Sequence, residues 1–149
     1  MLLIGLKNIG EQTTLATGNV NLGNVYRKYC RANRCGTPAF SVTSNGVTLN
    51  HEGIYHVTAT LVGTGETAGD VSVQLAENGE LLTGAISTET ITTATTEFRT
   101  FVIDYYIKVD KDVVLGVPTT DAKTISLVNV SDGIDATFTS VVLNVEKVV

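Results

Sequence analysis

The sequence predicts an all-β fold with about eight to ten strands arranged as a sandwich or barrel. Threonine and valine abound, tryptophan is absent and prolines number only two, a composition typical of strands rather than helices. Turn-forming Asn-Gly and Asp-Gly pairs recur along the chain, and such pairs tolerate the positive φ that tight hairpins need. Between these turns, apolar and polar residues alternate with a period of two, as in a sheet with one buried face.

The chain has 149 residues, which fits one domain with a two-sheet core. Residues 1–37 mix Asn, Gly and Thr with one basic cluster, so we expect an irregular lead-in or an edge strand there. Residues 38–149 are predicted to form the sandwich domain. No Ser or Asp cap precedes a useful apolar stripe of period 3.6, so helices are not expected.

Three long strands are predicted from clear alternation, at residues 54–62, 98–109 and 138–147. Tyr55, Phe101 and Val141 each begin the apolar face of one of these strands. Shorter strands are predicted at residues 39–43, 71–75, 113–117 and 125–130. Turns are predicted at residues 44–46, 63–65, 77–80 and 131–133.

The charge content indicates a protein that assembles with other subunits. Charged residues make up 17% of the chain, against about 25% in an average protein, so part of the surface is expected to meet other chains. The net charge of −5 argues against general binding of nucleic acid, which needs a basic face. No apolar run approaches the ~20 residues of a membrane helix, so no membrane partner is expected.

Cys30 and Cys35 have the spacing Cys-x4-Cys. A zinc site would need two more ligands, and His51 and His56 form no second pair beside the cysteines, so no metal is predicted. A local disulfide and two free thiols both remain open.

Four of the ten Lys and Arg residues lie within one short segment of this acidic chain. They are Arg27, Lys28, Arg31 and Arg34. A solvated surface loop accounts for such a cluster. The alternative hypothesis is a docking segment that meets an acidic partner surface, such as a capsid shell.

Catalytic motifs are not found. The sequence has no nucleophile elbow, no Gly-rich phosphate loop and no His-Glu-x-x-His. The acidic residues of Val109-Asp110-Lys111-Asp112 are interpreted as solvated charges in a tight turn. We therefore predict neither an enzyme nor a cofactor.

From Gly46-Val47-Thr48-Leu49 onward the chain resembles the tumour necrosis factor and complement globular-head superfamily. The resemblance continues through Glu52-Gly53-Ile54-Tyr55-His56-Val57, the Asn78-Gly79 hairpin, the aromatic strand at residues 98–107, the segment 109–115 and the closing strand at 138–148. It implies a jelly-roll-like antiparallel β-sandwich that assembles as a homotrimer. Within this superfamily, the layout is similar to small stand-alone proteins of tailed bacteriophages.

The phage resemblance implies a viral structural protein, a capsid decoration or head-fibre-type trimer that stabilises the particle or presents a binding surface. Its location would be the virion, assembled in the host cytoplasm, and its partner a capsid or other virion protein. The alternative is a carbohydrate- or receptor-binding jelly roll on a fibre, cell or spore surface, with a host-surface glycan as ligand.

A trimer would also give a role to three polar residues on predicted strands. His56, Asp104 and Asn144 lie on the strand faces opposite the apolar ladders. If that sheet packs around a three-fold axis, these residues would form a buried polar layer that sets register. Three unrelated exposed polar residues are the alternative.

Overall fold

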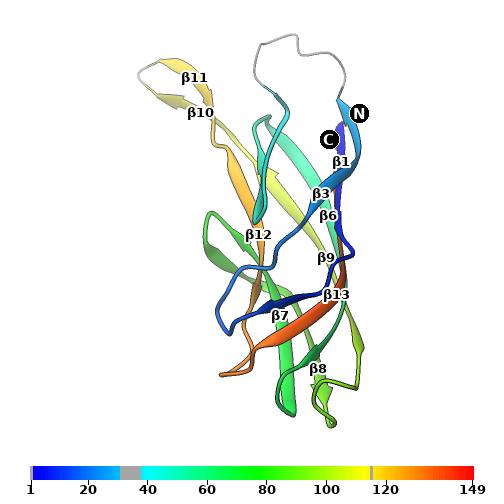
Figure 1. Ribbon diagram of the computed structural model, residues 1–149. Coiled ribbons are helices and arrows are strands. Elements are labelled where there is room, and N and C mark those ends of the chain that lie inside the picture. Colours follow the sequence, from blue (N-terminus) through cyan, green and yellow to red (C-terminus); the bar gives the residue numbers. More distant parts are fainter. Residues whose placement is uncertain (1, 31–37, 115) are drawn as a thin grey trace.

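The computed structural model describes residues 2–30, 38–114 and 116–149, which form two antiparallel sheets stacked face to face (Figure 1). The predicted all-β sandwich is confirmed, with more strands than expected. In the described residues no helix is long and apolar enough to cross a membrane. The strands are β1 (Leu2–Asn8), β2 (Gln12–Thr14), β3 (Asn24–Cys30), β4 (Phe40–Thr43), β5 (Gly46–Leu49), β6 (Gly53–Gly65), β7 (Gly69–Glu77), β8 (Glu80–Ile91), β9 (Arg99–Val109), β10 (Lys111–Val114), β11 (Val117–Thr120), β12 (Lys123–Asn129) and β13 (Ala136–Lys147).

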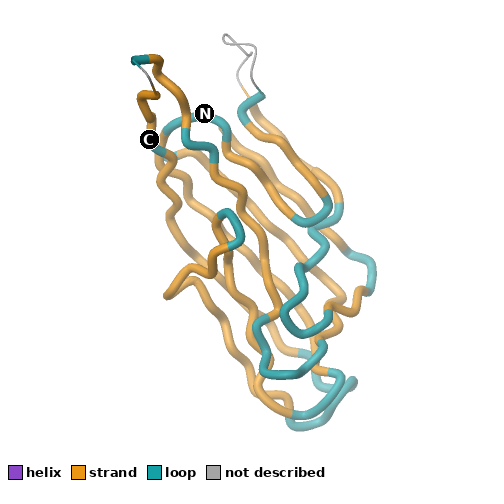
Figure 2. Tube along the Cα trace, turned by 90° about the vertical axis from the view of Figure 1, so that its left-hand side faces the viewer, coloured by secondary structure: helices purple, strands orange, loops and turns teal. Residues whose placement is uncertain are grey.

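Sheet A has the order β3-β1-β13-β6-β9, and β2 pairs with the beginning of β13. The three long strands that alternation predicts lie side by side in it, because β13 and β9 pair with β6 on either side. Sheet B has the order β4-β5-β12-β7-β8. Figure 2 shows the strands of both sheets running along the long axis of the molecule.

Both sheets contribute apolar side chains to one core. Phe101 and Phe138 meet edge to face with ring centroids 6.1 Å apart, and both are fully buried. Phe40 of sheet B packs in the same way against Tyr55 of sheet A, at 6.2 Å. Edge-to-face pairs of this kind add to the stability that burial of the rings already gives. Tyr55 donates its hydroxyl to the His51 carbonyl at 2.8 Å, and burial raises its pKa to about 12.

The part of residues 1–37 that the structure describes contributes more to the sheet than the sequence indicates. β3 is an edge strand of sheet A, but β1 lies inside the sheet between β3 and β13. The apolar run of β1 hides the alternation that identifies a strand, although Ile4 and Leu6 are fully buried. The expected domain boundary after residue 37 falls at residues outside the described part.

Three turn predictions are confirmed and one is wrong. Residues 131–133 connect β12 to β13, with a φ of 65° at Gly133. Asn78 and Gly79 have φ values of 51° and 83° and connect β7 to β8, as a two-residue hairpin turn requires. A two-residue connection also joins β4 to β5. Residues 63–65 instead continue β6. There a side chain on Gly63 would lie 2.5 Å from the Phe138 ring, so the glycine serves close packing.

The single strand predicted at residues 113–117 is also wrong. The chain reverses there, because β10 pairs antiparallel with β11 and Gly116 has a φ of 77°. These two strands form a separate ribbon that projects beyond the sandwich (Figure 1).

Candidate assembly surface

The face of sheet A that points away from the core, hereafter the outer face, combines exposed apolar and polar side chains. Alternation along each strand decides which residues lie on it. On β9 they include Val102, which is 59% exposed, and Tyr106, which is 60% exposed. Across the sheet, Asn144 lies opposite Thr58, which lies opposite Asp104. All three polar residues predicted for a trimer layer are therefore on this face.

His56 and Asp104 contact each other directly. The His56 Nε2 atom lies 2.6 Å from Asp104 Oδ1, and the imidazole stacks on the Tyr106 ring with centroids 4.8 Å apart. The pairing of β6 with β9 produces this contact. His56 lies opposite Tyr106, and Thr58, two residues further along β6, lies opposite Asp104. The Asp104 side chain is 64% exposed, and an exposed pair contributes no more than about 1 kcal/mol.

Asn144 lies in the same row as Asp104, but it has a different partner. Its Oδ1 atom accepts a hydrogen bond of 2.6 Å from the Tyr26 hydroxyl. The structure therefore brings His56 and Asp104 together and leaves Asn144 in a second contact on the same face. Whether the three form one layer in an assembly stays a prediction.

Tyr26 is a residue of this face that the sequence does not reveal. A side chain on Gly5 would lie 2.6 Å from Asn144 Oδ1 and 2.7 Å from the Tyr26 ring, so the ring lies directly over the glycine. Lys7 Nζ lies 5.5 Å from the centroid of the same ring, within range of a cation–π interaction. A glycine inside a strand indicates such a close approach, but it does not name the approaching residue.

An apolar band lies beside these polar contacts. Val142 is opposite Thr60, which is opposite Val102, and Val62 follows on β6. Val142 and Val62 are half-buried, and Val102 is exposed. Apolar side chains next to satisfied polar groups are typical of protein–protein interfaces.

The predicted docking segment is described only in part. Arg27 and Lys28 are exposed on β3, whereas Arg31 and Arg34 lie outside the described residues. Cys30 is half-buried and packs against the core. Cys35 lies outside the described residues, so the state of the two cysteines stays open.

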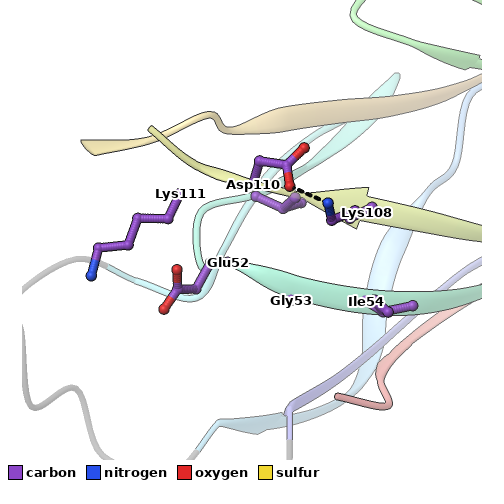
Figure 3. A pocket seen from close by; sticks show the side chains of 7 residues that line it. Glu52, Gly53, Ile54, Lys108, Asp110 and Lys111 are labelled. Atoms are coloured by element: carbon purple, nitrogen blue, oxygen red, sulfur yellow. Dashed lines mark ion pairs between the residues drawn. The ribbon is translucent and has the colours of Figure 1, made fainter. Parts of the chain in front are cut away.

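An open cleft of about 240 Å³ lies where β6 begins and β9 ends (Figure 3). Its charged lining residues are Glu52, Lys108, Asp110 and Lys111, and Lys108 pairs with Asp110 at 2.6 Å. Asp110 lies between β9 and β10, close to the turn that the sequence predicts. In the described residues no group of three or more His, Cys, Asp or Glu is placed to hold a metal ion. The cleft thus combines charged side chains with the apolar side chains of Ile54 and Val109.

Comparisons with known proteins identify the fold. No protein-family model matches the sequence, and no curated protein matches it either. Among solved structures, the globular domain of zebrafish complement 1qA superposes with a TM-score of 0.66 at 8% identity, over 100% of this chain and 98% of that one. The Eiger TNF of S. frugiperda also has a TM-score of 0.66, at 11% identity, over 100% and 94% of the two chains.

The chain has the fold of the TNF/C1q jelly rolls. A third similar structure is the vertex protein P5 of the phage PRD1, with a TM-score of 0.55 at 15% identity, over 99% of this chain and 97% of that one. The fold expected from the sequence resemblance is thus confirmed. At these identities the similarity concerns the fold of a TNF/C1q jelly-roll module and does not extend to its role.

Proposed function

We propose that this TNF/C1q jelly roll is a homotrimeric structural protein of a bacteriophage particle, of the capsid decoration or head-fibre type. It assembles through the outer face of sheet A and works passively, by stabilising the shell or presenting a binding surface. The proposal includes no chemical reaction and no cofactor. Its location is the virion, after assembly in the host cytoplasm.

The observation that carries the assembly is the composition of the outer face. Val102 and Tyr106 are exposed there, next to polar contacts that are already satisfied within the chain. Covering apolar surface contributes roughly 25 cal/mol per Å² removed from water. The hydrogen bonds of these polar groups within the chain offset part of the cost of covering them.

The phage role has separate support. The likeness to a phage vertex protein gives one example of this fold on a virus particle. Arg27 and Lys28 add a basic strand to a chain of net charge −5, which suits an acidic partner such as a capsid protein.

Light scattering after size-exclusion chromatography tests the assembly. We expect a mass of three times 15.8 kDa for the wild type and a monomer for Val102→Asp, because a charge would be buried in the interface. The matched control is Ile86→Asp, since Ile86 is 46% exposed on sheet B, and this variant should stay trimeric. A monomeric wild type, or a trimeric Val102→Asp, contradicts the proposal.

Cryo-electron microscopy of particles that carry the protein tests its place on the virion. Density for trimers at regular surface sites supports decoration, and particle surfaces without such density contradict it. The second candidate function is a glycan- or receptor-binding module, which the charged side chains lining the cleft beside Glu52 favour. Specific binding on a glycan array, lost on Glu52→Ala, would support that function instead.

A further inference from the structure

β3 is an edge strand of seven residues that has no second partner strand among the described residues. The two sheets end in β3, β9, β4 and β8. β8 and β9 lie next to each other, and the Val102 amide donates to Ser87 Oγ across the gap at 3.3 Å. β4 has four residues, whereas β3 has seven and pairs, among the described residues, with β1 alone. The free edge of β3 therefore offers unpaired N–H and C=O groups to another strand.

The side chains of β3 are exposed as well. Val25, Tyr26 and Tyr29 are 41%, 42% and 53% exposed. Edge strands are normally protected from pairing by being short, bulged or charged. β3 has a bulge near Gly5 and Leu6 of its partner strand, but its pairing is regular from Arg27 to Cys30. It also carries Arg27 and Lys28, which protect it from basic strands but not from acidic ones. Exposed tyrosines along such an edge are typical of binding surfaces.

The charges of β3 indicate the kind of partner. Arg27 and Lys28 are adjacent, so they point to opposite faces of the sheet. A strand placed beside β3 would meet one cation on each face. Opposite charges on neighbouring strands are favourable and like charges are not, so the complementary strand is acidic on both faces.

A second copy of this chain does not fit the same edge. Full antiparallel overlap of two β3 strands, which are centred on Arg27, would place Arg27 of one copy opposite Arg27 of the other, and these cations repel each other. The trimer contact of the proposed function uses the outer face of sheet A, whereas the backbone groups of the β3 edge lie in the plane of the sheet. The edge therefore stays open for a different protein.

We propose that an extended acidic segment of a partner protein adds to sheet A as a strand beside β3. Main-chain hydrogen bonds hold the segment, and Arg27, Lys28 and the tyrosines select its side chains. This inference deepens the docking role of the proposed function and rests on it only for the claim that the partner belongs to the particle.

Peptide binding to the full chain tests the inference. The probe is a labelled nine-residue peptide of Thr, Val and Glu, measured by fluorescence anisotropy against a peptide with Lys in place of Glu. A third peptide keeps the acidic sequence but carries N-methyl groups on alternate residues, which removes the donors that strand pairing needs. We expect the acidic peptide to bind, and the other two to bind at least about tenfold more weakly.

Substitutions in the protein test whether the peptide binds beside β3. Arg27→Glu with Lys28→Glu should weaken binding of the acidic peptide by about tenfold or more, because repulsion replaces attraction. The matched control, Lys108→Glu with Lys111→Glu, makes the same charge change at two exposed residues. One lies on β9 at the opposite edge of sheet A and the other on β10 outside that sheet, so this variant should bind as the wild type does.

Amide hydrogen exchange across residues 24–30 should slow when the acidic peptide binds. Equal binding of the N-methylated peptide, or unchanged binding by the Arg27 and Lys28 variant, would overturn the inference. Light scattering of every protein sample reports the oligomeric state separately. A monomeric wild type that still binds the peptide would contradict the trimer and leave the β3 site standing.

Discussion

Thr64 and Thr137 face each other on β6 and β13, and both are buried. Thr137 exchanges a hydrogen bond of 2.9 Å with Thr13 and donates to Glu66. In the described part of the chain, the Thr64 hydroxyl has no hydrogen-bond partner. A buried hydroxyl without a partner costs about 1–3 kcal/mol, so the two threonines affect stability in opposite directions.

We therefore expect Thr64→Val to raise the midpoint of thermal unfolding by about 2–4 °C, equivalent to about 1 kcal/mol. Thr137→Val changes the same atoms one strand away and should lower the midpoint, because it leaves Thr13 and Glu66 without their shared partner. Differential scanning calorimetry of the two variants checks both signs. A lower midpoint for Thr64→Val would show that its hydroxyl is bonded after all.

At the level of single residues, part of the candidate site could be predicted from the sequence. His56 and Asp104 lie on the face opposite the apolar ladder, and alternation alone places them there. The contact of Asn144 with Tyr26 is different, since it depends on β3 folding back beside β1 with a shift in register. Period-two patterns within one strand contain no information about such a bulge.

Among the elements, the connection between β8 and β9 is held by one carboxylate. The Thr92 hydroxyl and the Thr92 amide donate to Glu97 at 2.7 Å, and the Thr93 amide donates at 3.0 Å. The hydrogen bond from the Thr92 hydroxyl contributes most, followed by those from the two amides and from Arg99, and together they lower the pKa of Glu97 from 4.5 to about 2. The ionised form is thus the one that the folded connection prefers.

This lowered pKa gives the connection a pH dependence. The stabilisation is fully present above pH 4.5, the ordinary pKa of the group, and is lost as the pH falls through about 2. Glu97→Gln should therefore lower the unfolding midpoint at pH 6, and its difference from the wild type should shrink towards pH 2. Thermal unfolding at several pH values measures this, with Glu80→Gln as a control in an exposed hairpin. A difference that does not change with pH would contradict the prediction.

A strand could be predicted from the sequence when one of its two faces is buried and the other is exposed. β6, β9 and β13 alternate clearly, because each buries one face in the core and leaves the other outside. β8 was missed, since most of its residues are exposed at the edge of sheet B and Gly84, with a φ of 89°, interrupts it. An edge strand with two exposed faces has no apolar ladder to detect.

For the whole molecule, the trimer hypothesis assigns His56 a role that depends on assembly. In a single chain, the exposed His56–Asp104 pair contributes little to stability. When a neighbouring subunit excludes water from the pair, the loss of one partner costs considerably more. The effect of removing His56 should therefore appear in association and not in the fold of one chain.

We expect His56→Ala to raise the concentration at which the trimer dissociates by about tenfold or more. In the monomeric Val102→Asp background the same change should leave the unfolding midpoint within about 1 °C. Analytical ultracentrifugation and thermal unfolding check the two parts. If the concentration at which the trimer dissociates does not change, His56 takes no part in the subunit contact.

The fold as a whole was predictable from the spacing of turns and alternating strands, but the path of the first thirty residues was not. They add β1 and β2 to sheet A, and then the Val20 amide donates to Leu127 O of sheet B at 2.8 Å before the chain returns as β3. This path crosses between sheets, and only long-range packing decides it.

The ribbon of β10 and β11 pairs only with itself in the described structure, outside both sheets (Figure 1). A change in its length therefore alters no strand pair of the sandwich, and lengthening a closed loop costs little free energy. Exposed turns of this kind accept inserted sequence readily. The ribbon is thus the place where this chain can gain residues, or display a foreign peptide, while the jelly roll keeps its register.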